Sequence, residues 1–109
     1  MAHLLKTISK RSIFVMVREK GKMLHGRTFN IQFFEDKTLN NSISVGFTAT
    51  KKLGTAVKRN KAKRIMRELA RKVIAKYGEI NSYYVLIAKK PIFEIPFRSQ
   101  EIELKELIS

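Results

Sequence analysis

The sequence predicts an α+β domain in which a small sheet is covered by one long helix. Two segments, 27–34 and 42–50, alternate apolar and polar residues, which is the pattern of half-buried strands. A third segment, 55–77, repeats apolar residues at helical spacing. At 109 residues, of which 44% are hydrophobic, the chain is sized for one domain with one core.

The first predicted element is a helix over residues 10–20, with Ser9 as its N-cap and Gly21 at its end. Its apolar face is formed by Ile13, Phe14 and Val17. Residues 21–26 are expected to form a loop that leads into the first strand.

In the two predicted strands, apolar side chains share one face, and small or polar side chains share the other. The apolar set is Phe29, Ile31, Phe33, Ile43, Val45, Phe47 and Ala49. Residues 35–41 have turn composition and are expected to close a hairpin between the strands. The polar face is expected to be open, whereas the apolar face needs a cover.

The long helix is predicted to begin at the N-cap Thr55 and to end at Gly78. Its apolar stripe consists of Ala62, Ile65, Met66, Leu69, Val73 and Tyr77. Opposite that stripe lie Asn60, Lys63, Arg64, Arg67 and Arg71. Residues 51–76 hold eleven lysines and arginines against one acid, Glu68, and so carry ten of the chain's net fourteen positive charges.

The remaining elements are shorter. Residues 83–88 form a strongly apolar strand, which is ended by the Lys-Lys-Pro sequence at 89–91. Pro96 opens a last helix over residues 97–108, which carries three glutamates and is the one acidic segment.

The basic face of the long helix indicates an anionic partner. Like charges at i, i+4 spacing, such as Lys63 and Arg67, each cost a helix about 0.2–0.5 kcal/mol. A face that is merely solvated would use Glu–Lys pairs, and Glu68 alone supplies one. A membrane-surface helix needs its apolar face free for lipid, but here the sheet requires that face. RNA or DNA phosphate is therefore the favoured partner.

The composition argues against several other classes. No cysteine is present, which removes disulfides and thiolate chemistry and fits a reducing cytoplasm. The acids are scattered, the pair Glu35–Asp36 is expected to serve a turn, and His3 and His25 are isolated and expected to be exposed. A protein nuclease would need clustered carboxylates or a placed histidine. We expect no signal peptide and no membrane span.

The segment 44–68, Ser-Val-Gly-Phe-Thr-Ala-Thr-Lys-Lys-Leu-Gly-Thr-Ala-Val-Lys-Arg-Asn-Lys-Ala-Lys-Arg-Ile-Met-Arg-Glu, resembles the signature of the bacterial ribonuclease P protein component. The order and lengths of the other predicted elements are also similar to that family. Two positions depart from its pattern. Lys61 stands where an arginine is usual, so a bidentate guanidinium contact is lost there, and Thr50 replaces a serine.

The resemblance implies a two-layer α-β-β-β-α-β-α domain of the ribosomal protein S5 domain 2-like type. In that fold the basic helix lies in a left-handed βαβ crossover. A third strand before the long helix would have to come from residues 21–26 or from a split of the predicted strands. The resemblance also implies the role of a non-catalytic subunit bound to ribonuclease P RNA. The RNA, with Mg²⁺ held mainly by it, would cut the 5′ leader from precursor tRNA. The protein would hold that leader between the first helix and the sheet, with no obligate protein partner inferred.

The motif and the charge together assign contacts with the catalytic RNA to Lys51, Lys52, Lys58, Arg59, Asn60, Lys61, Lys63, Arg64 and Arg67. For Arg59, a bond from the helix start to the sheet is the alternative role. Leader contacts are assigned to Phe14, Asn30, Gln32, Thr48 and Tyr84. Packing in the core is an equally good role for Phe14. Two other functions stay open: a structural RNA-binding protein of ribosomal type, and a protein-only nuclease, which the scattered acids disfavour.

Overall fold

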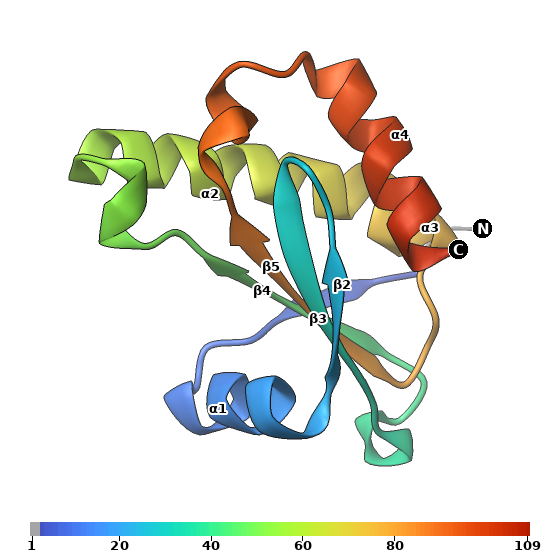
Figure 1. Ribbon diagram of the computed structural model, residues 1–109. Helices are drawn as coiled ribbons and strands as arrows, with labels where there is room; N and C mark the ends of the chain where they lie inside the picture. The colour runs from blue at the N-terminus through green and yellow to red at the C-terminus, as the bar shows by residue number, and fades with distance from the viewer. Residues whose placement is uncertain (1–2) are drawn as a thin grey trace.

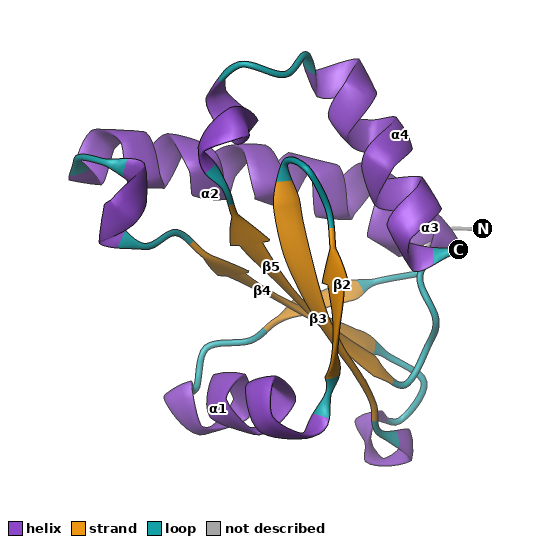
Figure 2. Ribbon diagram, in the orientation of Figure 1, coloured by secondary structure: helices purple, strands orange, loops and turns teal. Residues whose placement is uncertain are grey.

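The computed structural model describes residues 3–109 as a five-stranded mixed sheet with helices on both faces (Figures 1 and 2). The strands are β1 (Leu5–Thr7), β2 (Lys22–His25), β3 (Phe29–Glu35), β4 (Ile43–Thr48) and β5 (Ser82–Ala88). The helices are α1 (Arg11–Lys20), α2 (Ala56–Leu69), α3 (Ala75–Tyr77) and α4 (Phe97–Ile108). The predicted α+β class is confirmed.

The sheet has the order β1-β4-β5-β3-β2, and this order corrects the predicted hairpin. The turn at residues 35–41 forms, because the Asp36 carboxylate accepts from the Thr38 amide at 3.0 Å and from the Thr38 hydroxyl at 2.7 Å. However, the turn joins strands that are not neighbours. The strand β5 lies between them, parallel to β4 and antiparallel to β3. It takes the centre because it is apolar on both faces, as buried strands are.

Two strands escaped the sequence prediction. Residues 21–26 were expected to form a loop, but Lys22–His25 form β2, which pairs antiparallel with β3. This is the third strand before the long helix that the resemblance required. The strand β1 pairs parallel with β4. Both are short edge strands that are mostly exposed, so neither shows the alternation that marks a half-buried strand.

The main core lies between the sheet and the helices α2 and α4. The alternating apolar residues of β3 and β4 face it as predicted, and they meet Met66, Leu69 and Leu104, which are fully buried. The opposite face of the sheet carries a smaller core under α1, centred on Val17 and Val85. This face was expected to be open, and that expectation is wrong where α1 covers it.

The first helix begins one residue later than predicted. Lys10 occupies the N-cap position and its side chain makes no capping hydrogen bond, so Ser9 is not the cap. The C-terminal boundary is confirmed, because the Gly21 amide donates to the Val17 carbonyl at 2.9 Å.

The predicted long helix is interrupted. It begins as expected, because the Thr55 hydroxyl accepts from the Lys58 amide at 3.3 Å. Residues Ala70–Ile74 then form a π-helical turn before α3. The extra residue in such a turn rotates the following residues by about 100° around the axis. Ile74 and Ala75 are therefore buried, whereas Tyr77 leaves the apolar stripe and is 43% exposed.

The last helix has its predicted bounds and ties the remaining segments together. The Glu103 carboxylate accepts from the Thr28 amide at 3.0 Å and from the Thr28 hydroxyl at 2.7 Å, which fastens the turn between β2 and β3 to α4. The Gln100 amide group is buried and donates to the carbonyls of Ile92 and Ile95. The segment that links β5 to α4 is thereby closed onto the helix.

Candidate nucleic-acid interface

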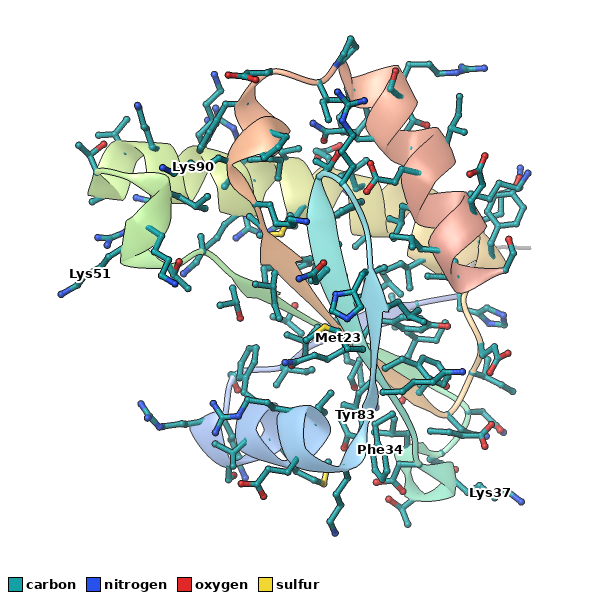
Figure 3. All side chains as sticks on the ribbon, in the orientation of Figure 1. Met23, Phe34, Lys37, Lys51, Tyr83 and Lys90 are labelled. Atoms are coloured by element: carbon teal, nitrogen blue, oxygen red, sulfur yellow. The ribbon has the colours of Figure 1, made fainter. Side chains whose placement is uncertain are left out.

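The start of α2 is built by a short sequence of local devices. The strand β4 runs into a 3₁₀ turn at Lys51–Leu53, which the buried side chain of Leu53 anchors in the core. Gly54 then adopts φ +123°, a conformation that side chains rarely tolerate. Thr55 caps the helix. Lys51 and Lys52 are left exposed beside the first turn of α2, and Lys51 points away from the molecule in Figure 3.

The residues assigned to RNA form one surface along the turn and α2, which we call the basic face. It comprises Lys51, Lys52, Lys58, Arg59, Asn60, Lys61, Lys63, Arg64 and Arg67. All are exposed except Arg59 and Lys63, which are half-buried. Within residues 3–109 the one ion pair shorter than 4.0 Å joins Arg71 to Glu68, so the cations of this face have no carboxylate partner there. Glu68 thus pairs with an arginine that lies outside this face.

The helix α2 covers one face of the sheet, and α1 lies on the other face. A groove runs beside α1, and two residues of the basic face, Lys63 and Arg67, line its edge. This groove has a volume of about 470 Å³. Its apolar wall comes from Phe14 of α1 and from Phe47 and Ala49, and its basic wall comes from Lys63 and Arg67. Arg67 lies over the Phe47 ring, with its guanidinium carbon 5.9 Å from the ring centroid. The groove therefore joins an aromatic surface to two cations of the basic face.

Phe14 both packs and lines this groove. A Cβ atom on Gly46 would lie 2.6 Å from Phe14 Cε1, so the ring fills the space that a side chain at position 46 would occupy. The small residues Ser44 and Gly46 lie on the sheet face that was expected to be open, but α1 and Phe14 cover them. The space is open one row further along the sheet, at Thr48.

The sheet register places a second predicted residue on the same row as Thr48. Thr48 is paired with Ile87, and Ile87 is paired with Asn30. Adjacent strands are about 4.8 Å apart, so Asn30 and Thr48 lie on one face about 10 Å from each other. The Asn30 side chain accepts from the Gly26 amide at 3.3 Å. Gln32 lies on this face, one row nearer to α1, and is only 8% exposed.

The assignment of Tyr84 to the leader is wrong as a surface contact. Tyr84 is 1% exposed and lies in the main core, on the sheet face opposite to α1. Its ring packs against Phe33, and its hydroxyl accepts from the Glu79 amide at 2.9 Å. Burial raises the pKa of the Tyr84 phenol. The sequence could not place it, because β5 is apolar on both faces and shows no alternation.

The site also contains residues that were not predicted. Thr7, the last residue of β1, and Ile8, which follows it, line the groove, and so do Phe47 and Ala49, which had been assigned only to the core. The roles of Thr7 and Ile8 could not be predicted, because β1 itself was not predicted. The signal for Phe47 was its position directly before the basic segment.

The acids do not gather into a cation site. Within residues 3–109 no three His, Asp or Glu side chains lie close enough together to hold a metal ion. His3 and His25 are exposed as predicted, and Asp36 serves its turn. The hydrogen bonds from Thr38 lower the pKa of the Asp36 carboxyl. No helix in this part of the chain has the length and apolarity to cross a bilayer.

A family model described as ribonuclease P matches residues 4–109. The chain belongs to the bacterial ribonuclease P protein family. The ribonuclease P protein component of Caulobacter vibrioides is 39% identical over 82 residues, which cover 75% of this chain and 54% of that protein. The chain thus spans about half the length of this relative. The Bacillus pumilus component is 30% identical over 100 residues, which cover 92% of this chain and 82% of that protein.

Solved structures of the family have the same fold. The ribonuclease P protein of Staphylococcus aureus superposes with a TM-score of 0.77 at 27% identity, over 93% of this chain and 90% of that one. The protein of Thermotoga maritima gives a TM-score of 0.80 over 94% of both chains. At 23% identity, the second likeness concerns the fold alone. The basic helix connects the adjacent parallel strands β4 and β5, so it lies in a βαβ crossover; the left-handed sense of that crossover stays a prediction.

Proposed function

We propose that this chain is the RNA-binding protein subunit of a ribonuclease P holoenzyme. In this proposal the basic face binds the catalytic RNA, and the groove beside α1 binds the single-stranded 5′ leader of precursor tRNA. The observation that carries the proposal is the continuity of the two surfaces. Lys63 and Arg67 belong to the basic face and also line the groove, so one protein could hold both RNAs next to each other.

The basic face suits a phosphate backbone. Its lysines and arginines are uncompensated, and neutralising phosphates with them releases counterions, which makes binding strongly dependent on salt. Arg59, Arg64 and Arg67 can bind phosphate oxygens with two N–H groups at once, whereas Lys61 offers a point charge. If about six phosphates are neutralised, log K should fall with log salt at a slope of about −4 to −5.

The groove suits a single strand. Phe14 offers a ring edge and face to an unpaired base, and stacking of this kind contributes about 1–3 kcal/mol per base. The Thr48 hydroxyl and the Asn30 amide supply hydrogen bonds along the same row of the sheet. Arg67 at the mouth supplies a cation for the leader phosphates. Because Arg67 lies over the Phe47 ring, Phe14 is the ring that remains for stacking, and we expect hydrogen bonds to contribute more than stacking.

The protein would bind and position rather than cleave. Within residues 3–109 the acids form no group of three that could hold a metal ion, and we propose that the RNA holds Mg²⁺ and carries the hydrolysis. Placing substrate and catalyst together with correct orientation is itself a large contribution to rate. The holoenzyme would act in the cytoplasm and remove the leader to leave the mature 5′ end of the tRNA.

Reconstitution with a bacterial ribonuclease P RNA tests this proposal. At low Mg²⁺, added protein should restore removal of the leader from precursor tRNA, whereas protein without the RNA should cut nothing. Robust cleavage by RNA-free protein would sink the proposal. Tighter binding to ribosomal RNA than to ribonuclease P RNA would favour a structural protein of ribosomal type instead.

A further inference from the structure

A second basic surface lies at the other end of the interrupted helix, where it meets α4. It is a shallow groove of about 290 Å³, and four cations line it together with Tyr77. These cations are Lys72, Lys76, Arg98 and Lys105. We call this surface the distal basic groove. None of its residues belongs to the basic face or to the groove beside α1.

Helical geometry creates this separation, because successive residues such as Arg71 and Lys72 point about a quarter of a turn apart around the axis. Arg67 and Arg71 line a groove on the side of β1, together with Leu5. Lys72 and Lys76 instead line the groove on the side of α4. The charges of segment 51–76 are therefore not one stripe. They are divided into two surfaces that face different sides of the helix.

Aromatic rings hold three of the four cations in place. The Lys105 ammonium lies 4.3 Å from the centroid of the Tyr77 ring, and the Lys76 ammonium lies 5.3 Å from the same centroid. The Lys72 ammonium lies 5.4 Å from the centroid of Phe97. Lysine side chains lose much freedom when a ligand orders them. Because these contacts already restrict them, less entropy remains to be lost on binding.

The groove is also short of negative charge. The acidic helix α4 contributes Glu101 to its lining, and within residues 3–109 no carboxylate lies within 4.0 Å of any of the four cations. Glu103, on the same helix, is engaged by Thr28. A group of four cations beside one carboxylate is complementary to a polyanion. Tyr77 is occupied by the two ammonium groups, so its ring is not free to stack on a base.

We propose that the distal basic groove is a second binding site for RNA backbone phosphates. This proposal rests on the proposed function, in which the partner of the chain is a large folded RNA. Arg59 and Lys76 are seventeen residues apart along a helix that rises about 1.5 Å per residue. The two surfaces together therefore extend over about 25 Å of the helix and face different sides of it, so they would engage different segments of that RNA. The cations offer charge and no base-specific pattern, so the contact is independent of sequence.

The test compares two double variants that lose the same charge. Lys76→Gln/Lys105→Gln removes two cations of the distal basic groove. Lys20→Gln/Lys37→Gln removes two exposed lysines elsewhere, and Lys37 lies at the far side of the molecule from α2 and α4 (Figures 1 and 3). Affinity for a bacterial ribonuclease P RNA is measured across a range of salt. The first variant should bind more weakly, with a slope shallower by about 1.4–1.8. Equal slopes and affinities for the two variants would overturn the proposal.

Two further measurements distinguish phosphate binding from a purely structural role of the lysines. If the lysines only fasten α3 to α4, the first variant should lose thermal stability and keep the RNA affinity of the control, which also overturns the proposal. The chain has no cysteine, so Ile102→Cys, at an exposed lining position, can carry a unique photo-crosslinker. Crosslinks to RNA should form from position 102 and not from Lys37→Cys, and their absence at 102 counts against the site.

The proposed function can fail separately. If the unmodified protein shows no preference for ribonuclease P RNA over another structured RNA, that function is refuted. The difference in slope between the two double variants still decides whether the distal basic groove binds phosphates, because the contact does not depend on sequence.

Discussion

Replacing Gly46 with alanine tests how α1 is seated on the sheet. A Cβ atom at this position would lie 2.6 Å from Phe14 Cε1, 2.8 Å from Phe14 Cζ and 3.3 Å from Ile8 Cδ1. Separations below 3.0 Å cannot persist, so the Phe14 ring or α1 must move. Adding a methyl group to a well-packed place costs about 1–3 kcal/mol.

An opposing effect makes the sign of the change informative. Gly46 lies in a strand and does not adopt positive φ, so its backbone accepts alanine. Replacing such a glycine stabilises a protein by about 0.4–1 kcal/mol, because the unfolded chain loses freedom. With Phe14 present we expect a net loss of about 1 kcal/mol, or about 4–8 °C in Tm for a domain of this size. In a Phe14→Leu background the clashing Cε1 and Cζ atoms are gone, and the same change should be neutral or stabilising.

The assay is urea unfolding of four proteins: the parent, each single variant and the double variant. The free energies of unfolding form a double-mutant cycle whose coupling measures the clash. Equal destabilisation in both backgrounds would show that Phe14 is not the group displaced. Stabilisation of the parent by Gly46→Ala would refute the packing argument altogether. A ring displaced into the groove should also weaken leader binding while affinity for the catalytic RNA is unchanged.

Four other expectations are independent of that cycle. Arg64→Glu with Arg67→Glu should greatly weaken RNA binding in a filter assay and leave the circular dichroism spectrum unchanged; normal affinity would show that the basic face does not bind RNA. Glu103→Ala takes away the acceptor of an amide and a hydroxyl in the β2–β3 turn, so unfolding free energy should fall by about 1–3 kcal/mol. Hydrogen bonds from the neighbouring lysines lower the pKa of Tyr77, so absorbance titration should show one tyrosine ionising first, and Tyr77→Phe should abolish that step. Burial raises the pKa of the Tyr84 phenol above its unfolded value of 10.0. The neutral phenol therefore contributes its full share to the free energy of unfolding below pH 10.0, and this share is lost as the pH rises through the higher pKa of the folded state.

The elements that were predicted correctly are those whose side chains face two different environments. The strand β4 alternates because Val45 contacts the main core and Ser44 does not, and α2 shows its stripe because one side is buried. The strand β5 was found from its apolar run, but its place between β3 and β4 was not, because a strand buried on both faces carries no sign of its neighbours. The edge strands β1 and β2 are held mainly by backbone hydrogen bonds, which leave little mark on side-chain pattern.

The part of the candidate site that depends on charge could be predicted. The part that depends on contacts between residues far apart in the sequence could not. The basic face is local to one helix, so its residues could be read from helical spacing. The groove needs Phe14 from α1 to meet Thr48 from β4, and the sequence could name both without showing that they meet. The π-helical turn was not predictable, since the apolar spacing of 62–73 fits a regular helix and only Tyr77 falls out of place.

The helix α2 can carry uncompensated charge because its stability comes from the sheet. The like-charged neighbours Arg59 and Lys63, and Lys63 and Arg67, cost about 0.2–0.5 kcal/mol each. On its opposite side Met66 and Leu69 are fully buried, and each contributes about 1.5–3 kcal/mol. Burial thus exceeds the repulsion several-fold, and no intrahelical Glu–Lys pairs are required to keep the helix formed. The charges are therefore free to be satisfied by a phosphate partner, and removing them should lower RNA affinity while the fold is retained.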